Sequence, residues 1–235
     1  MKKSLGLSLT LSLGFVFTPT VHASAILFNY TTGNLGQGSG ANSIVETVSG
    51  ETVTATAWSL TGHSDTTFQT ATLGQYSGYG LGVCNQIEVL NCSAPQHEID
   101  DNGQKDFVLL TFSSPITSIT ITIDPVCDCD TNASYYVGNN LNPLGDTLAQ
   151  LGTATNSNET QKDVTRTITL TGLGSGVNSV LFGASIAGTD NYFKIESISV
   201  VDPPAVAPEP ATFAVAGAGL MALGVLRRKK AKARI

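Results

Sequence analysis

The residue types that could do chemistry gather in two long irregular stretches of the sequence, 83–105 and 125–163. The first contains Cys84 and Cys92, and the second contains Cys127 and Cys129. Most of the clustered aspartates lie within or beside the same stretches. Loops of this length without regular structure are more often functional or disordered than idle connections. These two stretches are therefore the predicted location of a functional site.

The four cysteines indicate two disulfides, because the ends of the chain, described below, predict export. Local pairing would join Cys84 to Cys92 and Cys127 to Cys129. A bridge between residues i and i+2 is disfavoured, since their Cα separation in extended chain reaches the upper edge of the usual range of about 4.4–6.8 Å. We favour cross-loop pairing, which closes a ring of about 40 residues and stabilises the fold by roughly 3–4 kcal/mol. Zinc held by four thiolates is the alternative, but the cysteine spacing suits it poorly.

The carboxylates of the same region suggest a calcium site. Ca²⁺ takes oxygen ligands from carboxylates, amides and backbone carbonyls in irregular loops. The candidate ligands are Asp100, Asp101, Asp106, Asp124, Asp128 and Asp130. Their spacing does not match an EF-hand loop, and a solvated acidic rim is the alternative interpretation.

No catalytic residues are predicted. The body of the chain has two histidines, His63 and His97, and it lacks the Gly-x-Ser-x-Gly elbow of serine hydrolases. His97 is interpreted as an exposed loop residue rather than a general base. A pair of carboxylates could hydrolyse a glycoside, so a secreted hydrolase stays an alternative function.

The elements that must position these loops are strands. Apolar residues alternate with Thr and Ser, as Ile119, Ile121 and Ile123 do, which is typical of half-buried strands. We mark eleven candidate strands and expect about ten to form: Ala25–Tyr30, Ser43–Val48, Thr52–Leu60, Thr67–Leu73, Gly78–Val83, Phe107–Phe112, Ile116–Ile123, Tyr135–Val137, Val164–Leu170, Val177–Phe182 and Phe193–Val200.

Many strands, turn-forming Gly and Asn clusters and the lack of an amphipathic helical repeat predict an all-β fold. The expected architecture is an antiparallel β-sandwich of jelly-roll type in one domain, residues 24–202. A short helix is predicted at 146–151 and a mobile surface loop at 152–162.

The N-terminus has the layout of a secretory signal peptide, residues 1–23. Lys2 and Lys3 precede a short apolar run, and small residues follow it. Cleavage is predicted after Ala23 or after Ala25. Signal peptidase and the Sec translocon are the expected partners of this segment.

The charge of the body differs from that of the whole chain. The chain has a formal net charge of −6, but residues 24–202 carry 17 acidic and 4 basic residues. Phosphate contacts need Lys and Arg, so nucleic-acid binding is excluded. Such a body suits cations or a neutral hydrated matrix.

The C-terminus predicts processing and anchoring. A Pro-rich linker, 203–207, leads to Pro208-Glu209-Pro210, an apolar run at 211–226 and the basic residues Arg227, Arg228, Lys229 and Lys230. The run has 16 residues, fewer than the roughly 20 of a comfortable membrane-spanning helix. A single, transient anchor helix with its basic end in the cytoplasm is therefore expected.

Residues 208–235 closely resemble a PEP-CTERM sorting signal. The resemblance implies an exported protein of a Gram-negative bacterium that an exosortase processes, with Pro208, Glu209 and Pro210 as the recognition site. The apolar run would hold the precursor in the cytoplasmic membrane until processing. The protein would then reach the cell surface or extracellular matrix.

The stretch 78–138, with Gly80–Val83, His97–Gly103 and Asp106–Phe112, is similar to the body of many PEP-CTERM proteins of unknown activity. Because that family is associated with extracellular polysaccharide, the resemblance implies a non-enzymatic role in a biofilm or floc. A calcium-assisted carbohydrate-binding module is the alternative function.

Overall fold

A computed structural model describes residues 24–32, 43–61, 67–88, 97–159, 162–202 and 218–219. Within these ranges no helix has the length and hydrophobicity that a membrane span requires. The predicted signal peptide, linker, Pro-Glu-Pro motif and basic tail lie outside the described residues and stay predictions.

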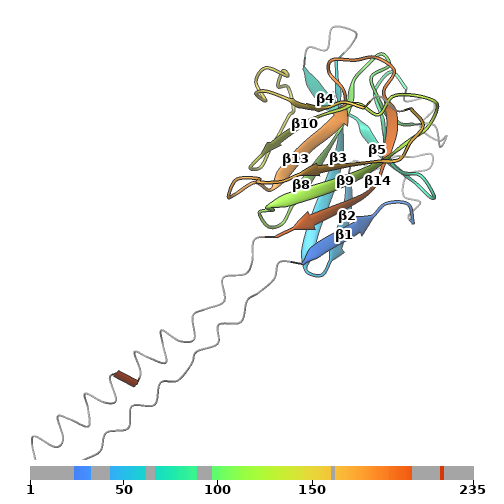
Figure 1. The fold of residues 1–235 in the computed structure, drawn as a ribbon. Helices are drawn as coiled ribbons and strands as arrows, with labels where there is room; N and C mark the ends of the chain where they lie inside the picture. The colour runs from blue at the N-terminus through green and yellow to red at the C-terminus, as the bar shows by residue number, and fades with distance from the viewer. Residues whose placement is uncertain are drawn as a thin grey trace, which may run out of the picture. The chain divides into compact units, whose positions relative to one another are not determined.

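The described body is all-β, as predicted, and consists of two antiparallel sheets (Figure 1). The first sheet contains, in spatial order, β5 (Thr72–Tyr76), β6 (Gly80–Cys84), β14 (Tyr192–Val201), β9 (Ser118–Pro125) and β12 (Arg166–Leu170). One edge of β14 pairs with β9. Along its other edge β14 also pairs with β7 (Ile99–Asp100) near its start and with β1 (Ala25–Asn29) near its end.

The second sheet contains, in spatial order, β2 (Ser43–Val48), β3 (Glu51–Leu60), β8 (Asp106–Phe112), β13 (Ser179–Ala184), β10 (Ala133–Gly138) and β11 (Thr155–Ser157). The short strand β4 (Phe68–Thr70) pairs with the end of β3. All pairs between these strands are antiparallel.

The main hydrophobic core joins residues of both sheets. In β9 the predicted alternation is confirmed, because Ile119, Ile121 and Ile123 are fully buried while the threonines between them are partly exposed. They pack in the same cluster as Val108 and Leu110 of β8. Fully burying such a side chain contributes about 1.5–3 kcal/mol, so this cluster is the main source of the stability of the body.

A second cluster lies on the other face of the second sheet. Phe107 and Leu109 alternate with the core residues of β8, yet they are buried as well. They pack with Trp58 of β3, and Leu148 and Leu151 lie against this cluster. The segment after β10 therefore covers the outer face of the sheet instead of leaving it to solvent.

Each of the eleven predicted strands overlaps an observed one, and three local predictions are corrected. The predicted strand Thr67–Leu73 is split at Ala71, because β4 belongs to the second sheet and β5 to the first. Residues 146–151 form turns rather than a helix. The predicted loop 152–162 contains β11, which pairs with β10.

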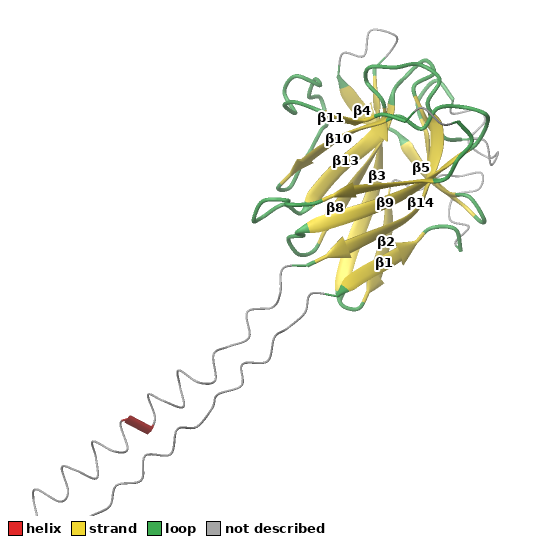
Figure 2. Cartoon of the chain, viewed as in Figure 1, coloured by secondary structure: helices red, strands yellow, loops and turns green. Residues whose placement is uncertain are grey.

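The sandwich has two ends, which we call the terminal end and the loop end (Figure 2). At the terminal end β1 begins and β14 ends, with Ala25 opposite Val201. At the loop end lie residues 97–106, 125–132 and 185–192, around the start of β14. The ten residues of β14 separate the two ends by about 30 Å.

Candidate functional site

The two cysteine-bearing stretches meet at the loop end, on either side of the start of β14. Tyr192 pairs with Asp100 of β7, and Phe193 pairs with Ile99 on one side and with Pro125 of β9 on the other. One strand therefore brings together the residues that follow β6 and those that follow β9.

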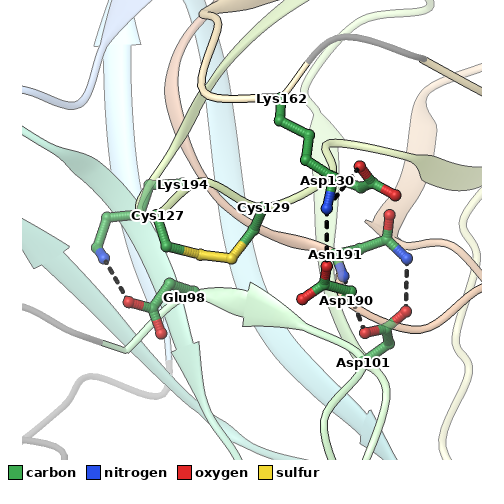
Figure 3. The surroundings of a disulfide bond; sticks show 9 residues. All are labelled: Glu98, Asp101, Cys127, Cys129, Asp130, Lys162, Asp190, Asn191 and Lys194. Carbon is green, nitrogen blue, oxygen red and sulfur yellow. Dashed lines mark hydrogen bonds and ion pairs between the residues drawn. A yellow bond between two sulfur atoms is a disulfide. The ribbon is translucent and has the colours of Figure 1, made fainter.

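Asn191 links the two stretches through hydrogen bonds (Figure 3). Its backbone N–H and its side-chain amide both donate to the carboxylate of Asp101, at 3.1 and 2.5 Å. Its side-chain oxygen accepts the backbone N–H of Asn132 at 3.0 Å. Both Asp101 and Asn191 are buried, so these bonds fix the relative position of the two loops.

The favoured cross-loop disulfides are wrong. Cys127 is bonded to Cys129, and their Cα atoms are 5.0 Å apart (Figure 3). The backbone N–H of Cys129 donates to the carbonyl of Cys127 at 2.7 Å, so the chain bends here and does not have the extended form that disfavoured this pair. Cys84 is disulfide-bonded as well, and Cys92 lies outside the described residues.

Two carboxylates lie in the interior of the loop end. Asp106 is fully buried and accepts hydrogen bonds from the side chain of Asn85 at 3.3 and 3.4 Å. Burial raises the pKa of Asp106 well above its usual value, and the negative charge of Asp100 adds to the effect. Burial, followed by the charge of Glu88, raises the pKa of Asp100 to about 8. The side chain of Asp100 is therefore mainly protonated at neutral pH.

A buried lysine faces these acids. The side chain of Lys194 has no exposed surface, and its Nζ lies 3.8 Å from a carboxylate oxygen of Glu98 and 5.3 Å from the ring centre of Tyr76. Burial lowers the pKa of Lys194 to about 8, against the opposing charges of Glu98 and Asp124. Among the described residues its Nζ makes no hydrogen bond.

The sequence offered no signal for this lysine. Its neighbours Phe193 and Ile195 face the core, so alternation places Lys194 on the outer face of the sheet, where lysine is normally solvated. Its pairing with Asp124 becomes visible only once the register of β9 and β14 is known.

The six predicted calcium ligands do not form one group. Asp100 and Asp106 are interior, and Asp101 holds Asn191. Asp124 accepts a hydrogen bond from the hydroxyl of Thr165 at 2.8 Å. Among the described residues, no three of these six side chains bring their oxygens within 4.8 Å of one another.

Lys162 lies at the surface of the loop end beside two aspartates, Asp130 and Asp190. Lys162 lies 3.1 Å from Asp190 and 3.7 Å from Asp130. The hydrogen bond to Asp190, together with the charges of Asp130 and Asp128, raises the pKa of Lys162. Protein cations therefore already balance part of the negative charge.

A cavity of about 330 Å³ opens beside these residues. It is lined by Asp101, Asn102, Gly103, Lys105, Thr189, Asp190 and Tyr192. The backbone of Gly103 has a φ of +88°, a conformation that favours glycine and turns the chain at the wall of the cavity. The lining combines hydrogen-bond donors, acceptors and one aromatic ring.

A second cavity of about 360 Å³ lies at the edge of the sandwich, between the strands β10 and β11 and the residues at the end of β12. It is lined by Tyr135, Val137, Thr155, Thr169, Leu170, Thr171 and Leu173, none of which is charged. Because it is similar in volume but has no charged lining residue, it serves as a control for binding at the loop-end cavity.

No protein-family model matches the sequence, and no curated protein is significantly similar to it. At the loop end His97, which was predicted to be exposed, is buried with an exposed fraction of 8%.

Proposed function

We propose that this protein is an exported, non-enzymatic β-sandwich that binds extracellular polysaccharide at its loop end. The observation that carries the proposal is the polar, partly aromatic cavity beside Asp101 and Tyr192. We further infer that the sandwich is of jelly-roll type, a double-sheet fold that lectin domains also use.

The lining of the cavity suits a sugar. Ligand sites combine an apolar wall with a few convergent polar groups that fix the orientation of the ligand. The carboxylate of Asp190 and the amide of Asn102 can accept and donate hydrogen bonds to hydroxyl groups. The ring of Tyr192 offers a face to C–H groups. The net negative charge of the body favours an uncharged glycan over an anionic one.

Binding is a better interpretation than hydrolysis. A glycosidase needs one protonated carboxyl group beside the scissile bond. In the cavity both oxygens of Asp101 accept hydrogen bonds from Asn191, and Asp190 pairs with Lys162. These contacts hold both carboxyl groups against protein donors rather than toward a glycosidic oxygen.

The position of the cavity supports display at a surface. The described domain begins and ends at the terminal end, with Ala25 beside Val201, while the cavity lies at the loop end. If the C-terminal segment anchors the chain, the cavity faces away from the attachment point. This arrangement suits a protein that binds matrix polymers.

Export and sorting are part of the same proposal. Signal peptidase would cleave the chain after Sec-dependent export, and an exosortase would process it at Pro208-Glu209-Pro210. Cleavage after Ala23 leaves β1 intact, whereas cleavage after Ala25 removes its first paired residue. We therefore expect a mature N-terminus at Ser24. The intact mass of the secreted protein measures both ends, and retention of Ile235 would contradict sorting.

Calorimetry with polysaccharide purified from the producing cells tests the binding function. We expect the mature protein to bind, and Tyr192→Ala to weaken binding at least tenfold, a loss of about 1.4 kcal/mol. Tyr135→Ala, in the second cavity, is the matched control and should bind as the wild type does. Equal binding by the Tyr192 variant, or loss of binding only in the control, would refute the proposal. Repeating the titration with a calcium chelator shows whether calcium assists.

A further inference from the structure

The end of β6 and the residues before β7 lie side by side. The backbone N–H of Val83 donates to the carbonyl of Glu98 at 3.3 Å. A Cβ atom at Gly82 would overlap the carbonyl oxygen of His97, so the glycine allows the two backbones to approach this closely. This contact places Cys84, the last residue of β6, next to His97.

Three donors of different chemistry meet at this point. The sulfur of Cys84, a carboxylate oxygen of Glu88 and a ring nitrogen of His97 all lie within 4.8 Å of one another. The side chains of Cys84 and His97 are buried, and Glu88 is partly buried. Among the described residues, no other group of three or more Cys, His, Asp or Glu side chains has this proximity.

The backbone also positions Glu88. The N–H of Asn85 donates to one of its carboxylate oxygens at 3.2 Å, and the N–H of Glu88 donates to the carbonyl of Asn85 at 3.1 Å. The turn that follows β6 therefore holds the carboxylate near the sulfur. None of the three donor residues lines the loop-end cavity.

Sulfur, nitrogen and oxygen donors together suit zinc. Zinc binds thiolate at about 2.3 Å and imidazole or carboxylate at about 2.0–2.2 Å, so tetrahedral ligands lie roughly 3.3–3.8 Å apart. Since the three donors lie within 4.8 Å of one another, they need to approach by at most about 1.5 Å to reach this geometry. A fourth position would remain for water. In the structure Cys84 is disulfide-bonded, so its sulfur is not a thiolate and cannot act as this ligand.

We propose that Cys84, Glu88 and His97 form a zinc site that is closed by the disulfide of Cys84 and opened when that disulfide is reduced. A dithiol reductant gives two electrons and two protons to the disulfide, and it becomes a disulfide itself. Cys84 is then a thiol, which releases its proton to solvent as its sulfur binds Zn²⁺. In the reverse direction a disulfide oxidant takes two electrons from Cys84 and its partner cysteine by thiol–disulfide exchange and leaves as a dithiol, which re-forms the protein disulfide and releases the metal.

The surroundings favour a cation once the thiolate is present. Glu98 follows His97 directly in the sequence. Its negative charge lowers the free energy of a bound divalent ion, although the ammonium of Lys194, 3.8 Å from Glu98, opposes this effect.

Metal titration of the mature protein in its two redox states tests the proposal. A water-soluble phosphine serves as the reductant, because it does not compete for zinc as a dithiol does. We expect one equivalent of Zn²⁺ to bind the reduced protein and about 100-fold weaker binding to the oxidised protein. Co²⁺ in place of zinc should show a thiolate-to-cobalt charge-transfer absorption in the reduced protein only.

Matched variants assign the ligands. The double variant C127S/C129S removes the other cysteine pair and should keep both the zinc affinity and the cobalt absorption after reduction. In that background, H97Q and E88Q should each weaken zinc binding at least tenfold, and C84S should abolish the cobalt absorption. Circular dichroism of each variant without metal shows whether the sandwich is folded.

Several results would overturn the site. The proposal is wrong if the oxidised protein binds zinc as tightly as the reduced protein, or if the reduced protein binds no zinc. It is also wrong if C127S/C129S no longer binds zinc after reduction. Unfolding of the sandwich on reduction that zinc does not reverse would overturn the site as well, because the donors would then no longer be held together.

Discussion

The two ends of the sandwich both bury acidic residues, but they do so in different ways. At the terminal end Glu51 is 2% exposed, and its carboxylate accepts the hydroxyl of Ser113 at 2.9 Å and the N–H of Ser114 at 3.1 Å. The carboxylate of Glu51 thus has local donors, whereas one buried oxygen of its neighbour Asp202 makes no hydrogen bond among the described residues. At the loop end, Asp100, Asp106 and Lys194 are buried near one another, and their pKa values are shifted toward the neutral forms.

The difference shows which end serves the fold and which end carries a further constraint. A single buried carboxylate with its hydrogen bonds satisfied costs little, whereas several buried ionisable groups cost stability. Perturbed groups of this kind beside a cavity are typical of functional sites. The loop end is therefore where we place the function, and the terminal end is the structural reference.

Replacing the buried Lys194 should lower the stability far more than replacing a buried acid at the terminal end. In Lys194→Met the ion pair to Glu98 is lost and the partly buried carboxylate of Glu98 is left without its buried partner, which we expect to cost about 3–5 kcal/mol. At the terminal end Glu51→Gln keeps an oxygen acceptor and should cost about 1 kcal/mol. Chemical denaturation of the two variants at pH 7 measures the contrast.

A double variant separates charge from packing. Adding Glu98→Gln to Lys194→Met removes the orphaned charge, so most of the lost stability should return. If the double variant is as unstable as Lys194→Met alone, the cost comes from packing and the interpretation of the buried pair is wrong.

The raised pKa of Asp100 should also make the stability of the protein depend on pH. The pKa of Asp100 is about 8 in the folded protein and about 3.9 in the unfolded chain. Between these values the folded state binds the extra proton, so the stability falls as the pH rises from about 4 to 8, and this loss is complete above pH 8. A pKa difference of about four corresponds to a loss on the order of 5 kcal/mol over this range.

Asp100→Asn should flatten that slope. The amide oxygen can still accept the N–H of Asn102, which the carboxylate accepts at 2.8 Å, and it carries no charge at any pH. Thermal unfolding of the wild type and of this variant from pH 4 to pH 9 measures the difference. An unchanged slope in the variant would mean that other groups dominate the pH dependence.

The smallest effect is expected for the cysteines after β9. The disulfide between Cys127 and Cys129 closes a ring of only three residues, so the chain-entropy model gives about 1.5 kcal/mol of stabilisation. C127S/C129S should lower the free energy of unfolding by that amount and leave binding at the loop-end cavity unchanged. A loss of several kcal/mol would show that this bridge organises the loop end beyond its own turn.

Strand positions were predictable because they follow a local rule. The alternation of Ile119, Ile121 and Ile123 with threonines predicts β9 and its buried face, and the structure confirms both. In contrast, β7 has two residues and β11 reads Thr-Asn-Ser, so neither shows an alternating apolar pattern. Each forms a strand because it pairs with a longer neighbour: β7 pairs with β14, and β11 pairs with β10.

The loop end was predicted only in its location. The cysteines and aspartates of the two stretches indicated the region, but the disulfide pairing depended on a bend at Cys127 that the sequence does not show. The burial of Asp106 and Lys194 runs against the general preference of charged residues for the surface. The burial of these two residues depends on which distant strands pack against them. A single sequence does not reveal the strand register that determines this packing.

Hydrogen–deuterium exchange with and without polysaccharide tests most directly that the loop end is the binding end. We expect slower amide exchange in residues 101–105 and 189–192 when polysaccharide purified from the producing cells is added, and no change in residues 135–137 and 169–173 at the second cavity. Protection at the second cavity, or at neither, would contradict it.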